Sequence, residues 1–69
     1  MNIHEEIYEE FREWSPEHAV QVSDWKPWGK TSIVVWLRNG LAYKVKRFAP
    51  NKFIMQLVSK EDIEHKFNK

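Results

Sequence analysis

Histidine and serine are among the side chains of this 69-residue chain with the types needed for acid–base or nucleophilic chemistry. The three histidines, His4, His18 and His65, stand in separate segments, and no two have the i, i+4 spacing that directs two imidazoles at one metal ion. The serines lack the surrounding sequence of a nucleophile elbow. The chain has no cysteine, which excludes disulfides and thiolate metal sites. We therefore expect no catalytic site, no metal site and no cofactor.

Ligand pockets and phosphate-binding loops are also not expected from this sequence. A chain of 69 residues leaves little room for a pocket beside its core. The two glycines, Gly29 and Gly40, are each explained by a turn, so they do not form a loop that surrounds a phosphate. The paired carboxylates near the start lie on an exposed helix face, which does not provide the desolvated setting that shifts a catalytic pKa. We expect no enzymatic activity and no small-molecule ligand.

Basic and aromatic side chains in the middle of the chain form the pattern that points most directly to a ligand. Residues 25–60 carry eight basic side chains and no acidic one, whereas residues 1–24 carry seven acids and one base. Positive charge attracts a phosphate backbone, and aromatic rings stack on unpaired bases. The predicted nucleic-acid-binding surface consists of Trp25, Lys26, Trp28, Lys30, Lys44, Lys46 and Arg47.

Two structural explanations compete with this interpretation. Lysine and arginine often occupy the solvent side of a strand, where they discourage pairing between sheets. Trp25 and Trp28 could instead fold back as a lid over the sheet. Two interpretations are open for the acidic face of the first helix. It is either an ordinary solvated face, with Glu9 and Arg12 at pairing distance, or a surface whose carboxylates mimic the phosphates of a nucleic acid.

The first element that must position these residues is a helix over 2–14. Its apolar residues recur at spacings of four, four and three, which places them on one face. Asn2 is a suitable N-cap, with Glu5 three residues later. Ser15-Pro16 ends the helix and could open a short extra turn, since the residue before proline avoids the α region. The apolar face consists of Ile3, Ile7, Phe11 and Trp14.

The remaining elements are strands followed by a second helix. The Asn39-Gly40 pair lies between two β-rich runs, which is typical of a two-residue hairpin turn. Ser59 and Asp62 have the capping-box spacing at the start of a short final helix. The predicted order is a strand over 19–25, a loop over 26–30, strands over 31–38 and 41–48, a turn over 49–52, and a strand over 53–58.

The two-residue turn fixes which side chains share a face of the hairpin. Position 38 then faces 41, and one face carries Val34, Trp36, Leu41, Tyr43 and Val45. The other face carries three branched aliphatic residues, and two short helices do not suffice to cover both faces. An uncovered apolar face is typical of an interaction site. The predicted protein interface consists of Ile33, Val35 and Leu37.

These elements predict an α+β fold in one domain over 1–69, with a three- or four-stranded antiparallel sheet between an N-terminal helix and a short C-terminal helix. We expect the first helix to pack on one face and the last to close an edge. The predicted core consists of Ile7, Phe11, Trp14, Val34, Trp36, Tyr43, Val45, Ile54 or Met55, Leu57 and Ile63. Phe48, Phe53 and Phe67 are expected to join it.

The start of the chain lacks a basic segment followed by an apolar one, so we expect no signal peptide, and no apolar run approaches the roughly 20 residues needed to cross a bilayer. We expect a cytoplasmic protein without membrane partners. The Lys/Glu-rich, cysteine-free and aromatic-dense composition resembles the small uncharacterised accessory proteins of Gram-positive bacteria and their prophages. The resemblance implies a host-directed modulator or small regulator.

The sequence thus leads to two functional hypotheses. The first is a non-enzymatic interaction or regulatory module that forms a homodimer or binds a protein partner through the second apolar face of the sheet. The alternative is a nucleic-acid-binding module that uses the basic sheet and exposed tryptophans.

Overall fold

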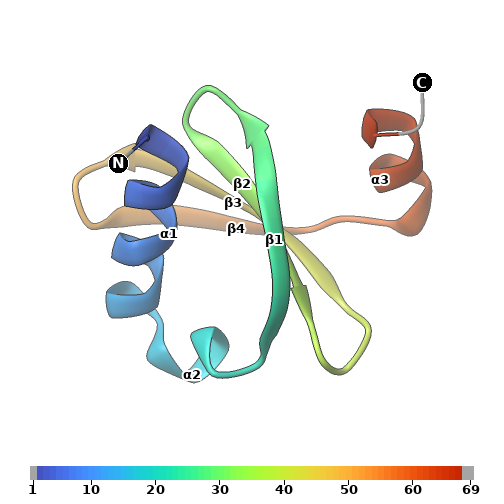
Figure 1. Cartoon of the computed structure of the whole chain (residues 1–69), viewed down its shortest axis with the longest axis horizontal. Helices are drawn as coiled ribbons and strands as arrows, with labels where there is room; N and C mark the ends of the chain where they lie inside the picture. Colours follow the sequence, from blue (N-terminus) through green and yellow to red (C-terminus); the bar gives the residue numbers. More distant parts are fainter. Residues whose placement is uncertain (1, 68–69) are drawn as a thin grey trace.

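A computed structural model describes residues 2–67, and this part of the chain forms a four-stranded antiparallel sheet with helices before and after it. The predicted α+β order is confirmed, and the strands lie in the order β1-β2-β3-β4 (Figure 1). The elements are α1 (Ile3–Trp14), α2 (Pro16–Ala19), β1 (Val22–Gly29), β2 (Ser32–Leu37), β3 (Ala42–Ala49), β4 (Lys52–Leu57) and α3 (Lys60–Phe67).

The helix boundaries follow from the capping residues. The Asn2 side chain accepts a hydrogen bond of 2.9 Å from the Glu5 backbone N–H at the start of α1. Pro16 occupies the first turn of α2, where its missing N–H costs nothing. At α3 the Ser59 hydroxyl accepts from the Asp62 N–H at 3.1 Å, and the Asp62 carboxylate accepts from the Ser59 N–H at 3.4 Å. The predicted capping box is therefore present.

The β2–β3 hairpin differs from the prediction by one residue. The Gly40 N–H donates to the Leu37 carbonyl at 3.1 Å, and Gly40 has a φ of 91°. The loop therefore contains three residues, Arg38-Asn39-Gly40, with glycine in the left-handed position that such loops require. As a result Val35 faces Tyr43, where the two-residue turn predicted Lys44.

This shift by one residue exchanges the partners on each face of the sheet. Ile33, Val35 and Leu37 now share a face with Tyr43 and Val45, and that face lies under α1. Ile7 and Phe11 of α1 complete the core with Phe53 of β4. The expectation that Ile33, Val35 and Leu37 lack cover is wrong, because their exposed fractions are 0%, 0% and 5%.

The predicted core is correct in part. Ile7, Phe11, Val34 and Val45 are fully buried. Several other side chains are exposed because they lie at strand ends, on the sheet edge or beyond the helix contact. These are Trp14, Phe48, Ile54, Leu57 and Phe67.

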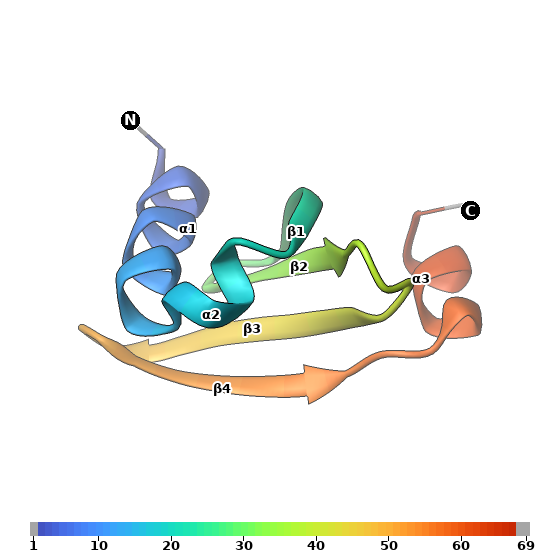
Figure 2. The same ribbon diagram turned by 90° about the horizontal axis from the view of Figure 1, so that it is seen from below.

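Two further expectations about the elements are wrong. Residues 26–29 continue β1 where a loop was expected, and Pro27 is tolerated because β1 is an edge strand. α3 does not close an edge, because its Phe67 ring packs against Trp28 and Trp36. Figure 2 shows α1 and α3 at opposite ends of the sheet. Within residues 2–67, every helix is too short or too polar to cross a membrane.

Candidate nucleic-acid interface

The face of the sheet opposite α1, which we call the far face, gathers basic and aromatic side chains. Strand alternation and the observed register define its members. Trp28 joins them because its ring contacts the Phe67 ring that also contacts Trp36. The far face carries Lys26, Trp28, Val34, Trp36, Lys44, Lys46, Ile54 and Gln56.

One row of this face runs across all four strands. Lys26 pairs with Val34, Val34 pairs with Lys44, and Lys44 pairs with Gln56. Val34 is fully buried although its register partners are two lysines. Lysine methylene groups can lie along apolar surface while the ammonium groups stay in water. Two strand spacings separate Lys26 from Lys44, about 10 Å. Lys46 lies two residues further along β3, so the three ammonium groups are spread over the face.

An aromatic cluster adjoins these lysines at the end of α3. The Phe67 ring lies 5.8 Å from the Trp28 ring and 6.3 Å from the Trp36 ring, measured between centroids. The Lys26 ammonium lies 5.7 Å from the Phe67 ring centroid, and the Lys66 ammonium lies 5.5 Å from the Trp28 ring centroid. Such cation–π contacts hold positive charge beside the aromatic surface.

The surface beside Trp28 is concave. A cleft of about 440 Å³ lies between the far face and α3. Lys44 and Lys66 contribute positive charge to it, and Asp62 contributes the one acidic side chain among its lining residues. Gln56 and His65 add hydrogen-bonding groups, so the cleft combines an aromatic wall with polar and cationic ones.

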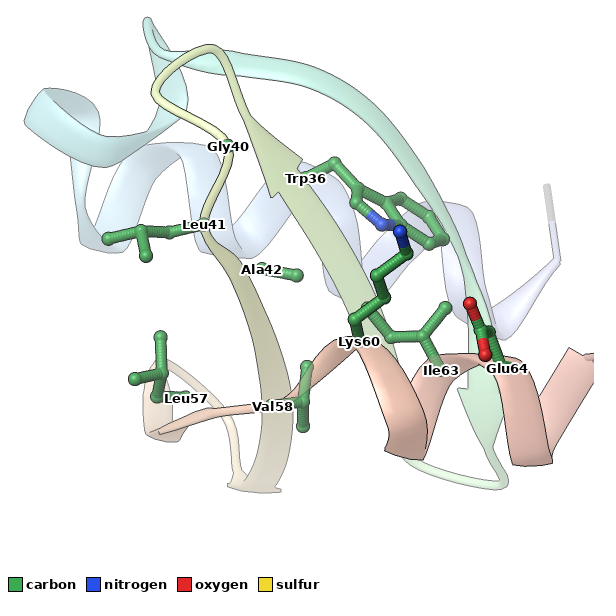
Figure 3. Close-up of a pocket in the computed structure, with 9 residues that line it drawn as sticks. All are labelled: Trp36, Gly40, Leu41, Ala42, Leu57, Val58, Lys60, Ile63 and Glu64. Atoms are coloured by element: carbon green, nitrogen blue, oxygen red, sulfur yellow. The ribbon is translucent and has the colours of Figure 1, made fainter.

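A second cleft, of about 530 Å³, lies between the β2–β3 loop and α3. Figure 3 shows the Trp36 indole and the Lys60 and Ile63 side chains on one side of it, with Leu41 and Leu57 on the other. Trp36 is half-buried. This far-face residue therefore remains partly accessible to solvent.

The structure brings together four of the seven residues predicted for nucleic acid. Lys26, Trp28, Lys44 and Lys46 share the far face. Lys30 is exposed in the turn between β1 and β2, near the end of the sheet where Ser32 pairs with Lys46.

Trp25 and Arg47 are placed elsewhere, on the α1 side. The Trp25 ring stacks on Tyr8 of α1 at a centroid distance of 5.0 Å. The Arg47 guanidinium donates to the Glu10 carboxylate and lies 3.7 Å from a Glu6 carboxylate oxygen. The Trp25 ring thus packs against the core, and the Arg47 charge is neutralised by the glutamates of α1.

Five glutamates lie on α1, away from the far face, whereas α3, which lines both clefts beside that face, carries Glu61, Asp62 and Glu64. Glu9 pairs with Arg12 at 3.1 Å, as the spacing predicted, and both side chains are more than half exposed. Asp24 is the acidic residue at a far-face register position, opposite Trp36, and its carboxylate accepts from the Trp25 backbone N–H at 2.8 Å. The molecule therefore has an acidic helix on one side of the sheet and a basic strand surface on the other.

Two of the histidines, His4 and His18, make hydrogen bonds that join neighbouring elements. The His4 imidazole hydrogen-bonds the Gly29 carbonyl at 2.6 Å, which ties α1 to the end of β1. His18 hydrogen-bonds the buried Ser15 hydroxyl at 2.6 Å, which braces the corner between α1 and α2. Among residues 2–67, no three His, Cys, Asp or Glu side chains are grouped to hold a metal ion.

Trp36, Gln56, Lys66 and Phe67 belong to this surface but were not predicted for it. Strand alternation from Lys44 and Lys46 would identify Trp36 once the three-residue loop is known, and Gln56 once the pairing of β3 with β4 is known. Lys66 and Phe67 carry no local signal, because their position depends on how α3 packs.

Comparisons of the chain with protein-family models, curated proteins and solved structures found no match.

Proposed function

We propose that the protein binds single-stranded nucleic acid on the far face of its sheet. The observation that supports this most strongly is the gathering of Lys26, Trp28, Lys44 and Lys46 on one face, with the acidic helix on the other. Lysines provide the sequence-independent attraction to phosphates, and the indole ring provides a stacking surface for a base.

A single strand fits this surface better than a duplex. Proteins that read a duplex commonly insert a basic helix into its major groove. Here α1 is acidic, with Glu5 and Glu6 in its first turn, so phosphates would repel it. A sheet with aromatic side chains is the surface on which unpaired bases stack.

Lys66 has a defined part in this proposal. Its ammonium occupies the space over the Trp28 ring that a stacked base would take. None of the described α3 residues is fully buried, so the end of this helix can yield at low cost. A displaced Lys66 remains beside the bound strand, where its charge is available to a phosphate.

The direct test compares the wild-type protein with a Lys26→Gln/Lys44→Gln/Lys46→Gln variant, using fluorescence anisotropy of a labelled mixed-sequence DNA oligonucleotide. Glutamine removes the charges and keeps half of the methylene groups of each lysine side chain. The control is Arg12→Gln, which removes a cation from α1. We expect loss of binding in the triple variant alone. Equal affinity of the triple variant and the control would contradict the proposal.

A further inference from the structure

The two edges of the sheet differ in how well they are protected. β1 contains Pro27 and two register shifts, which interrupt any pairing with another strand. β4 contains neither proline nor glycine, and within residues 2–67 it pairs only with β3. Figure 2 shows β4 along the margin of the molecule, with none of the described helices beside its outer edge.

Backbone hydrogen bonds show which residues of β4 face outward. The Val58 N–H donates to the Ala42 carbonyl at 3.0 Å, so Val58 is a hydrogen-bonded partner of β3. Such pairs alternate along an antiparallel ladder, which assigns Gln56 and Ile54 to the same class. Phe53, Met55 and Leu57 therefore direct their N–H and C=O groups away from β3, toward the open edge.

The side chains along this edge are largely apolar and partly uncovered. Leu57 is 63% exposed and Ile54 is 49% exposed. Met55 is half-buried against the core. Lys52 is the one charged residue of β4, and it stands at the beginning of the strand. An open, regular and apolar edge of this kind is a template for pairing with another strand.

We propose that two copies of the chain pair antiparallel through β4. The two-fold axis passes between the two Met55 residues, which lie opposite each other. A two-fold axis perpendicular to the sheet keeps each face on its own side, so paired residues must share a face. Centring on Met55 places Leu57 opposite Phe53 of the second copy, apolar on apolar. Centring on Ile54 would place Leu57 opposite Asn51, which leaves its side chain against a polar turn.

The charges at the two ends of this interface are complementary. Centring on Met55 places Lys52 opposite Val58 of the second copy and Asn51 opposite Ser59. Lys52, at the start of β4, thus lies near the first turn of the second copy's α3, which contains Glu61 and Asp62 against one base, Lys60. The attraction between Lys52 and the acidic first turn of α3 occurs twice in a two-fold dimer. This favours a second copy of the chain over another protein that would pair an acidic strand with β4.

The dimer has a geometric consequence for the proposed function. Because the axis is perpendicular to the sheet, both far faces lie on the same side of one eight-stranded sheet. Two binding surfaces joined in this way raise the effective concentration of the second one. The dimer itself does not depend on nucleic acid, so it is tested without any.

Disulfide trapping tests the register directly, because the chain has no cysteine of its own. Met55→Cys places two thiols opposite each other in a hydrogen-bonded pair, with Cα atoms about 5.5 Å apart, within the range of a disulfide. Ile54→Cys is the matched control, since residue 54 faces Gln56 of the second copy. We expect mild oxidation to cross-link Met55→Cys and to leave Ile54→Cys monomeric. Faster cross-linking of Ile54→Cys would overturn the proposal.

Sedimentation equilibrium of the cysteine-free protein provides a second test. We expect the mass to rise toward that of a dimer with concentration, and Leu57→Lys to abolish the rise while leaving the circular dichroism spectrum unchanged. Val20→Lys places the same charge at a site that is 71% exposed and outside β4, and it should dimerise normally. A wild-type protein that stays monomeric at its highest soluble concentration would overturn the proposal.

Discussion

The Tyr8 ring of α1 lies parallel to the Trp25 ring of β1, with centroids 5.0 Å apart and planes inclined by 12°. This stack joins the first helix to the edge of the sheet and places Trp25 at the margin of the core. Trp28, three residues later, lies on the opposite face with Phe67 and Lys66. The two tryptophans of one short segment therefore lie on opposite faces of the sheet, in different surroundings.

Substitution of these two tryptophans should separate binding from folding. Trp28→Ala removes the stacking surface and should weaken binding of single-stranded DNA by about 1–3 kcal/mol. Trp25→Phe keeps an aromatic ring against Tyr8 and should leave the affinity unchanged. Fluorescence anisotropy measures both, with circular dichroism to confirm that each variant is folded. Equal losses of affinity in the two variants would argue against a stacking role for Trp28.

Arg47 should contribute to stability and not to binding. Its side chain is 16% exposed and pairs with Glu10, whose other oxygen accepts from the Asn51 N–H at 3.1 Å. Arg47→Ala leaves that carboxylate without its main partner, so we expect a loss of about 1–3 kcal/mol in the free energy of unfolding. Urea denaturation measures the loss. Arg12→Ala breaks an exposed pair and should cost less than about 1 kcal/mol.

Two isoleucines provide a matched test of the sheet register. Ile33 is fully buried under α1, whereas Ile54 of β4 is 49% exposed. Ile33→Ala should lower the free energy of unfolding by about 2–5 kcal/mol, because it removes core contacts and leaves a cavity. Ile54→Ala should cost much less. Thermal or urea unfolding of both variants measures the difference, and similar costs would contradict the assignment of faces.

Gly40 should be needed for the β2–β3 loop. Its φ of 91° lies in the region that side chains avoid, and an added Cβ would meet no atom within 4 Å. Gly40→Ala should therefore cost about 1–2 kcal/mol through backbone strain alone. Arg38→Ala in the same loop should change stability by less than about 0.5 kcal/mol. Urea denaturation distinguishes them, and an unchanged midpoint for Gly40→Ala would count against the three-residue loop.

Local signals in the sequence predicted the helix caps and the order of the main elements, because the interactions that create them span only a few residues. Asn2 caps α1 through a bond to Glu5, and Ser59 exchanges bonds with Asp62. The faces of the sheet were not predicted correctly. Asn39-Gly40 serves equally in a two-residue and a three-residue loop, and the difference of one residue reverses every side chain relative to its partner strand.

The candidate surface was only partly predictable for the same reason. Lys44 and Lys46 share a face in any register, since they are two residues apart on β3. Trp25 and Trp28 looked equivalent while their segment was expected to be a loop, but both belong to β1, where a spacing of three residues places them on opposite faces. The contacts of Lys66 and Phe67 with the far face arise from tertiary packing of α3, to which no sequence pattern pointed.

The most direct test of the central claim is the salt dependence of binding to a single-stranded oligonucleotide. The logarithm of the binding constant should fall linearly with the logarithm of salt concentration, with a slope of about −0.7 for each phosphate neutralised. Removing Lys26, Lys44 and Lys46 together should make that slope shallower by about 2. Binding that is absent at low salt, or a slope that the triple variant leaves unchanged, would contradict a nucleic-acid-binding far face.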